Sequence, residues 1–360
     1  MWKDENVKDQ KAKALQIITY TEETNIKRHK QRQPIRDVII MSKDGSYWKG
    51  QVREIINPKP NQSLSNIEEC LFRYRSINEN NLKALSTNRL YFSLPTYFND
   101  PFDNLIYANS IFILDRIVNC LNLNMDGFLN SLVAKDPIKA GFGFAAWNGA
   151  EHELITAQFL NRVGNIVSYL NDALRNTVKM ICFSDRIDSM LMWSHYADYH
   201  KGYAVAYERN AIEKALFYDK EGNEIRKKPI LRQVHYTNKR LDLTDEIEHY
   251  LRCNLTPYSD EVSDVAYCIP AEKLRTAVLE KDLDWSYENE WRLIPKFINL
   301  FNESKLTYMV LKPKFVVLGA KCEDNNKKQI CKMCQANEIP VFEMAINNLN
   351  PKFELQITSA

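Results

Sequence analysis

Short runs rich in aromatic and β-branched residues recur along the chain and constrain its fold more than any other feature. Residues 70–75 read Cys-Leu-Phe-Arg-Tyr-Arg, and residues 315–319 read Phe-Val-Val-Leu-Gly. Runs of this length and composition are typical of strands, because such side chains pack well on a pleated surface. We predict further strands at 90–93, 181–184, 202–207, 233–236, 291–295, 308–311, 340–345 and 353–357.

Helical patterns separate these strands. Short helices are predicted at 78–87 and 327–335, and residues 105–180 carry longer helical patterns. Residues 209–280 are charged, and we expect mainly irregular structure there. The order of elements predicts the α+β class, a mixed body around one sheet with a helical insertion near 105–180.

The composition is that of an ordinary globular protein. Of 360 residues, 45% are hydrophobic and 26% are charged, and 48 Lys and Arg nearly balance 46 Asp and Glu. No run approaches about 18 apolar residues and no apolar signal segment is visible, so we expect neither a membrane helix nor secretion. The 8 Cys are scattered, which is typical of reduced thiols. We expect a cytoplasmic protein with no membrane partner.

Residues 1–60 differ from the rest in charge. They hold 13 Lys and Arg against 8 Asp and Glu, and the densest basic run is 27–32. A solvated arm explains such a run, and a nucleic-acid contact is the alternative. A helix near its start and a hairpin around Asp44-Gly45 are predicted. We interpret 1–60 as a basic accessory segment, and 61–360 as a single α+β domain.

One cluster of polar aromatic residues follows the strand at 181–184. The stretch 192–202 contains Trp193, His195 and Tyr196 within a few positions. Such side chains can stack on a ring and hydrogen-bond a ligand, and His195 suits a general base near neutral pH. The alternative is a structural turn with Trp193 in the core.

A second cluster has two carboxylates two positions apart. Glu288 and Glu290 would share one face of a strand, because the side-chain period is two, and Lys281 precedes them. Two carboxylates on one face repel, and one pKa tends to rise, which suits acid–base work or the stabilisation of a cation. The alternative is a strand face on which Glu290 and Arg292 pair with neighbours.

Two further motifs have structural interpretations. Residues 99–103 read Asn-Asp-Pro-Phe-Asp, which is typical of a turn, and a carboxylate metal site is the alternative. Cys331 and Cys334 with Cys322 give three candidate ligands, whereas a structural zinc site needs four. We interpret these as structural thiols and expect no metal. Phosphate-loop, dinucleotide-fingerprint and zinc-protease motifs are absent from the sequence.

Several strings together resemble the bacterial domain-of-unknown-function family 2971. They are FRYRS at 72–76, LYFSLP at 90–95, FNDPFD at 98–103, CFS at 182–184, MWSHY at 192–196, HKG at 200–202 and YENEWR at 287–292. The resemblance spans residues 70–320 and implies no particular activity.

The chain is more distantly similar to ADP-ribosyltransferases of the arginine–serine–glutamate type. These enzymes carry an Arg, a Ser and a Glu signature, in this order along the chain. That resemblance implies a mainly antiparallel sheet core, with NAD as substrate and Arg75, or else Arg73, as its anchor. Glu290 would be catalytic with Glu288 as its helper. Ser184, His195 and Tyr196 would line the pocket, and Tyr91 or Tyr196 would stack on nicotinamide.

The implied reaction is ADP-ribosyl transfer or NAD hydrolysis, with protein, nucleic acid or water as acceptor. By analogy with the family alone, the setting would be a bacterial toxin or an antiphage effector. One alternative is a metal-dependent nuclease, with Asp100, Asp103, Glu288, Glu290 and Lys281 gathered around a divalent ion and nucleic acid held by the basic arm. Another is a non-enzymatic effector or adaptor that binds a ligand.

Overall fold

The computed structural model divides the chain into two compact units, Met1–Ser65 and Asn66–Ala360. The described residues are 38–41, 47–50, 67–120, 149–253, 263–346, 351 and 354–359. In the first unit β1 (Val38–Met41) and β2 (Tyr47–Gly50) pair antiparallel, where the sequence predicts a hairpin. The helix expected near the start and the basic run 27–32 lie outside the described residues.

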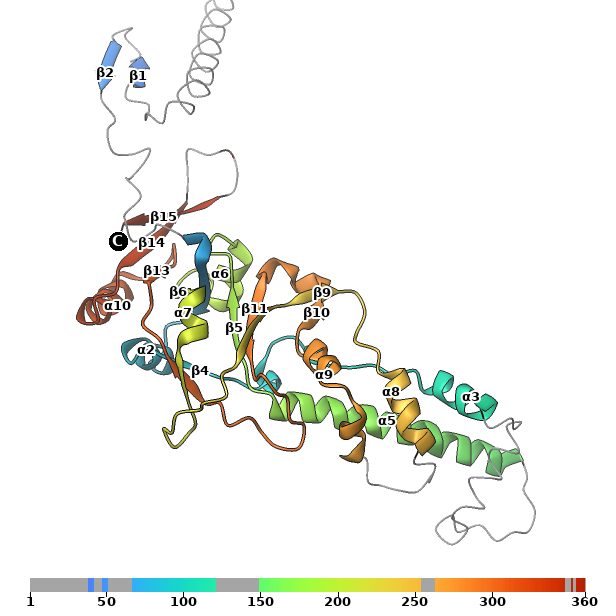
Figure 1. Ribbon diagram of the computed structural model, residues 1–360. Coiled ribbons are helices and arrows are strands. Elements are labelled where there is room, and N and C mark those ends of the chain that lie inside the picture. The colour runs from blue at the N-terminus through green and yellow to red at the C-terminus, as the bar shows by residue number, and fades with distance from the viewer. Residues whose placement is uncertain are drawn as a thin grey trace, which may run out of the picture. The chain divides into compact units, whose positions relative to one another are not determined.

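One large sheet organises the second unit (Figure 1). Its strand order is β15-β14-β13-β6-β3-β5-β11-β8, and β13–β14 is the parallel pair among otherwise antiparallel neighbours. The α+β class with a mainly antiparallel sheet is therefore confirmed. The strands are β3 (Cys70–Arg75), β5 (Ile181–Ser184), β6 (Tyr203–Glu208), β8 (Ile230–Gln233), β11 (Glu290–Ile294), β13 (Phe315–Leu318), β14 (Val341–Ile346) and β15 (Leu355–Ser359).

Two smaller sheets and three short helices complete the β-rich part. The order β4-β12-β7 joins strands that are far apart in the sequence, and β9 pairs parallel with β10. Their bounds are β4 (Arg89–Tyr91), β7 (Leu216–Tyr218), β9 (His235–Thr237), β10 (Glu280–Asp282) and β12 (Tyr308–Val310). The helices are α2 (Glu79–Ser86), α7 (Arg209–Lys214) and α10 (Asp324–Ala336). Asn78 caps α2 by accepting a hydrogen bond from the Asn81 amide at 2.9 Å.

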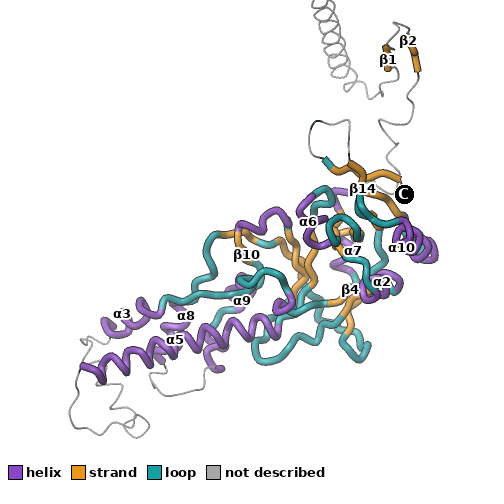
Figure 2. The backbone as a smooth tube through the Cα atoms, turned by 180° about the vertical axis from the view of Figure 1, so that it is seen from behind, coloured by secondary structure: helices purple, strands orange, loops and turns teal. Residues whose placement is uncertain are grey.

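A helical group lies at the end of this unit opposite to α10 and β14, as Figures 1 and 2 both show. It comprises α3 (Ser110–Cys120), α5 (Gly149–Thr177), α8 (Thr244–Cys253), α9 (Ala271–Ala277) and the 3-10 helix η4 (Ser263–Cys268). Its core includes Ile117, Ile166 and Ile247, which are fully buried. The expectation of irregular structure at 209–280 is wrong, because α8 and α9 pack against the predicted helical insertion.

A second core lies between the large sheet and α10. Val316 and Leu318 of β13 pack with Ile330 and Cys334 of α10. Seven cysteines are free thiols: Cys70, Cys182, Cys253, Cys268, Cys322, Cys331 and Cys334. Burial raises the pKa of Cys334 to about 12, so this thiol stays protonated and behaves as an apolar side chain. No described helix is both long and apolar enough to cross a membrane.

β3 and β5 are neighbours in the large sheet but pair at one position. Phe72 lies opposite Ser184, and within the described chain no other pair joins these two strands. The residue before β5, Met180, instead exchanges two backbone hydrogen bonds of 2.9 Å with Ser93. The sheet is therefore open between these two points, and a cavity lies there.

The segment after α6 (Met190–Tyr196) packs closely on β3. Asp198, Tyr199 and His200 all have positive φ angles, of 46°, 52° and 70°. A Cβ atom at the following Gly202 would lie 2.1 Å from the carbonyl oxygen of Arg75, so only glycine fits. This contact fixes α6 beside the end of β3, where the cavity opens.

Candidate functional site

The cavity between β3 and β5 has a volume of about 360 Å³ and brings most of the predicted site residues together. We call it the carboxylate cavity. Its walls include Arg73, Arg75, Ser184, His195, Tyr196, Glu288 and Glu290, together with Asn99 and Lys281. Tyr91 is the one predicted site residue that does not line it.

Arg73 and Arg75 form one wall. They alternate along β3 with the buried residues Phe72 and Tyr74, because successive side chains of a strand point to opposite faces. Both arginines are half-buried, and neither forms an ion pair with a described carboxylate. Burial and the charge of Arg75 together lower the pKa of Arg73 to about 9. This wall is thus a cationic surface that no described carboxylate neutralises.

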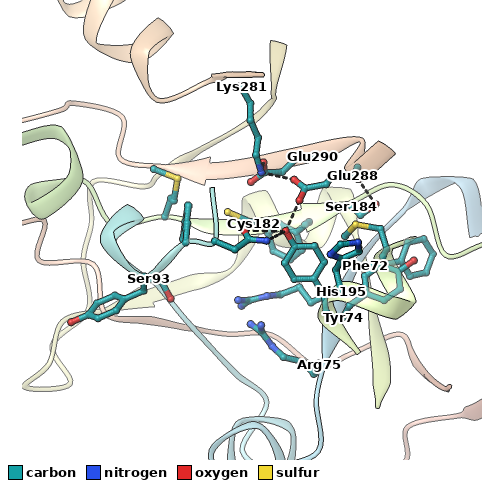
Figure 3. A pocket seen from close by; sticks show the side chains of 18 residues that line it. Phe72, Tyr74, Arg75, Ser93, Cys182, Ser184, His195, Lys281, Glu288 and Glu290 are labelled. Atoms are coloured by element: carbon teal, nitrogen blue, oxygen red, sulfur yellow. Dashed lines mark hydrogen bonds and ion pairs between the residues drawn. The ribbon is translucent and has the colours of Figure 1, made fainter. Parts of the chain in front are cut away.

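Glu288, Glu290 and Lys281 form the facing wall, and Figure 3 shows them across the pocket from Arg75. The Nζ atom of Lys281 lies 2.6 Å from Oε2 of Glu288 and 3.3 Å from Oε2 of Glu290. The three side chains are only 4–6% exposed. Burial would lower the pKa of Lys281, but the two carboxylates outweigh it and raise that pKa.

Arg292 of β11 holds Glu290 from the other side. Its Nε and Nη2 atoms donate to the two carboxylate oxygens of Glu290, each at 2.9 Å. It also binds both oxygens of Asp103, at 2.8 and 2.6 Å. Burial alone would raise the pKa of Glu290, but Arg292 and Lys281 outweigh it and hold the pKa at about 2. Glu290 is therefore ionised and fully paired.

Glu288 has a different environment. Burial raises its pKa, and the charge of Glu290 adds to the effect, while Lys281 opposes it. Its Oε1 atom accepts a hydrogen bond from the hydroxyl of Tyr196. That hydroxyl also contacts the side-chain amide of Asn99, with 3.1 Å to Nδ2. The pKa of Glu288 is therefore raised, with burial rather than repulsion by Glu290 as the main cause.

The expectation that both carboxylates lie on one strand is wrong. Glu288 ends a 3-10 helix, η5 (Leu283–Glu288), and Glu290 begins β11. Between them Asn289 is left-handed, with φ 43°, a conformation that asparagine tolerates better than most residues. Ser184 fixes this turn, because its hydroxyl donates to the carbonyl of Glu288 at 2.6 Å. The turn therefore brings both carboxylates to the cavity.

The cluster at 192–202 contains a residue of the core and residues that line the cavity, so both interpretations of the sequence apply to parts of it. Trp193 is fully buried, donates to the carbonyl of Ile187 at 2.7 Å and packs edge-on against Tyr74. His195 is exposed, lines the cavity and lies 5.8 Å from Tyr287 between ring centroids. Trp193 therefore supports the fold, whereas His195 and Tyr196 border the cavity.

A second cavity, of about 500 Å³, lies next to the first, and Arg73, Arg75 and Ser93 line both. We call it the basic cavity. Tyr91 lines it, because β4 pairs with β12 in the small sheet rather than with β3. Tyr91 is therefore separated from the carboxylates by the two arginines.

Three of the four carboxylates considered for a nuclease are bound by cations of the protein. Asp103 and Glu290 share Arg292, and Glu288 binds Lys281. Asp100 accepts from the Phe102 amide at 2.9 Å, as expected of a turn residue. In the part of the chain that the structure describes, no group of three or more His, Cys, Asp or Glu has metal-binding geometry.

A protein-family comparison matches part of this site. The model for "Protein of unknown function (DUF2971)" matches residues 192–293. The resemblance to this family is therefore supported, over a shorter stretch than the sequence strings suggest. Searches of curated proteins and of solved structures found no match.

The DUF2971 match contains Tyr196, Lys281, Glu288, Glu290 and Arg292, that is, the carboxylate wall and its supports. The arginine wall on β3, Ser184 and Asp103 lie outside it. Sequence reasoning missed the role of Asp103, because its partner Arg292 is 189 positions away and no local pattern joins them. It also missed Tyr236, whose hydroxyl accepts from the Glu290 amide at 2.8 Å.

Proposed function

We propose that the protein cleaves the nicotinamide–ribose bond of NAD in the carboxylate cavity and passes ADP-ribose to an acceptor or to water. One observation carries this proposal. Two half-buried arginines that have no anionic partner among the described residues face two buried carboxylates across one cavity. A ligand that is anionic at one end and becomes cationic at the other matches both walls, and NAD has this distribution of charge during the reaction.

The arginine wall suits the diphosphate of NAD. A guanidinium group binds phosphate oxygens through two parallel hydrogen bonds, and charge-assisted bonds of this kind are strong. Arg73 and Arg75 repel one another, and the repulsion contributes to the low pKa of Arg73. A bound diphosphate would relieve this repulsion.

The carboxylate wall suits the ribosyl cation. A preorganised negative charge in a buried site stabilises a cation that develops in the transition state. Arg292 and Lys281 already neutralise Glu290, whereas Glu288 has Lys281 and the neutral Tyr196 as partners. We therefore assign the stabilising carboxylate to Glu288 and a supporting role to Glu290, the reverse of the order that the resemblance implies.

The atoms and electrons of this reaction balance with NAD and the acceptor as the reactants. The bond between C1′ of the ribose and the pyridinium nitrogen breaks, and its electron pair leaves with neutral nicotinamide. An oxygen or nitrogen of the acceptor then attacks C1′ and gives up its proton. The exposed His195 at the cavity lies where it could accept that proton. Tyr196 and Ser184 hold Glu288 in place, through its carboxylate and its backbone.

The test is release of nicotinamide from NAD by the purified full chain, alone and with cell extract. The proposal predicts nicotinamide release that depends on the protein, and that Arg75→Gln weakens. Arg240→Gln is the matched control, because Arg240 is an exposed arginine on the helical side of the unit. Absence of turnover, together with absence of any NAD-dependent rise in Tm, would contradict the proposal.

A further inference from the structure

The basic cavity has a composition that the proposed function does not explain. Among the described residues, no Asp or Glu lines it and four cationic side chains do: Arg73, Arg75, Lys83 and Arg89. The diphosphate bridge of NAD has two negative charges and would engage the two arginines of β3. Lys83 and Arg89 remain for another anion.

The cations of this cavity are not neutralised by the protein itself. Among the described residues, neither Lys83 nor Arg89 forms an ion pair, and both are exposed at the rim. The floor holds Tyr203 and Tyr207, whose pKa values are raised by burial although Arg75 and Arg73 oppose the rise. Cationic side chains and neutral tyrosine rings with hydroxyl groups therefore line the same cavity.

A row of tyrosines continues from the rim across the small sheet. Tyr91 of β4 and Tyr218 of β7 both lie directly opposite Tyr308 of β12, so the three rings share one face. Tyr308 is 5.9 Å from Tyr91 and 5.1 Å from Tyr218 between ring centroids. The guanidinium of Arg89 lies 4.6 Å from the centre of the Tyr308 ring. Tyr91 is 41% exposed and is available for stacking.

We propose that the basic cavity and this tyrosine row bind single-stranded nucleic acid. Its phosphates lie on Lys83 and Arg89, and an unpaired base stacks on Tyr91. Proteins that bind single strands combine a cationic groove with exposed aromatic rings in this way. An acidic peptide would use the cations but not the rings. The binding site stands on its own, whereas its use as an acceptor site rests on the proposed function.

The acceptor role follows from the shared wall. Arg73, Arg75 and Ser93 border both cavities, so a strand in the basic cavity lies next to the carboxylate cavity. A ribose hydroxyl or a base nitrogen of that strand would attack C1′ of the bound NAD and lose its proton. The product is ADP-ribosylated nucleic acid and free nicotinamide.

Fluorescence anisotropy with labelled single-stranded RNA and DNA oligonucleotides tests the binding site. The comparison is the double variant Lys83→Gln/Arg89→Gln against Lys239→Gln/Arg240→Gln, which removes two exposed cations from the helical side. We expect the slope of log affinity against log salt to fall by about 1.4 in the first variant, because each phosphate contact contributes about 0.7 for a single strand. The control variant keeps the slope of the unchanged protein.

Tyr91→Ala supplies an independent readout. We expect it to weaken oligonucleotide binding by about 5- to 150-fold, which corresponds to the loss of one stacked base, with the salt slope unchanged. Unchanged affinity in both Tyr91→Ala and the double variant would overturn the proposal. A second result would also overturn the proposal. In that result the unchanged protein binds no oligonucleotide, AMP raises its Tm, and the double variant loses this rise.

Mass analysis of the oligonucleotide after incubation with NAD separates this inference from the proposed function. A mass increase of one ADP-ribose supports both. Nicotinamide release without oligonucleotide binding supports the proposed function and overturns the inference. Oligonucleotide binding without nicotinamide release supports the binding site and contradicts the proposed function.

Discussion

Arg292 binds Glu290 through both carboxylate oxygens, each at 2.9 Å. The pair belongs to a buried cluster with Asp103, Glu288 and Lys281. Three carboxylates and two cations leave one negative charge in excess when all are ionised. Because the pKa of Glu288 is raised and that of Glu290 is about 2, Glu288 is the first of the two to take up a proton as pH falls.

Arg292→Met should destabilise the protein strongly. The substitution leaves Asp103 and Glu290 buried with Lys281 as the one remaining cation, and loss of a partner from a buried ion pair costs about 3–5 kcal/mol. Urea unfolding measures the effect. Arg240→Met, at an exposed arginine, should change the free energy of unfolding by less than about 0.5 kcal/mol. Equal stabilities of the two variants would contradict the assigned ion pairs.

The two carboxylates should give stability opposite dependences on pH. The folded pKa of Glu288 is raised above its ordinary value of 4.5, so its ionisation opposes folding and lowers stability as pH rises through the raised pKa. The folded pKa of Glu290 is about 2, so its stabilisation is complete above about pH 4.5 and is lost as pH falls toward 2.

Unfolding curves between pH 2 and 8 test these signs. Relative to Glu288→Gln, the unchanged protein should lose stability as pH rises above 4.5. Relative to Glu290→Gln, it should lose stability as pH falls below 4.5. Curves that run parallel for all three proteins would show that neither carboxyl has a shifted pKa.

Gly202→Ala should distort the arginine wall. The new Cβ atom would lie 2.1 Å from the carbonyl oxygen of Arg75, a contact with backbone that cannot relax cheaply. Gly164→Ala is the control, because a Cβ atom there has nothing within 4 Å and lies inside α5. We expect the control to raise stability by up to about 1 kcal/mol and Gly202→Ala to lower it. Thermal unfolding measures both, and a stable Gly202→Ala protein would contradict the close approach.

The proposed anion site on β3 is testable without turnover. Pyrophosphate and ADP-ribose should raise the Tm of the unchanged protein. Arg73→Gln and Arg75→Gln should each weaken binding by roughly 10- to 100-fold, because a hydrogen bond to a charged group contributes about 1.5–3 kcal/mol. Calorimetric titration measures the affinities. Binding that survives in the combined variant Arg73→Gln/Arg75→Gln would place the anion elsewhere.

Much of the fold could be predicted because local patterns specify it. Strands β3 and β5 have their predicted bounds, and Asn78 caps α2 where the leucine spacing places its start. Helix α8 was missed although Ile247, Tyr250 and Leu251 follow helical spacing. Its many charged residues concealed that spacing.

The site was predictable in its residues more than in its geometry. The cavity gathers Arg75, Ser184 and Glu288 from three elements, as the order of motifs suggested. The left-handed Asn289 and the link from Asp103 to Arg292 depend on tertiary contacts, so no sequence pattern reports them. Tyr91 lines the basic cavity instead of the carboxylate cavity for the same reason, since β4 pairs with β12 across a long interval of sequence.

The most direct test of the central claim is the rate of nicotinamide release by Glu288→Gln. This variant keeps the shape of the side chain and removes the charge that would stabilise the ribosyl cation. Glu272→Gln, at an exposed position of α9, is the matched control. We predict a loss of about 10²- to 10³-fold in rate for Glu288→Gln, with folding and NAD binding retained, and no loss for the control. Equal rates of nicotinamide release in both variants would contradict the account.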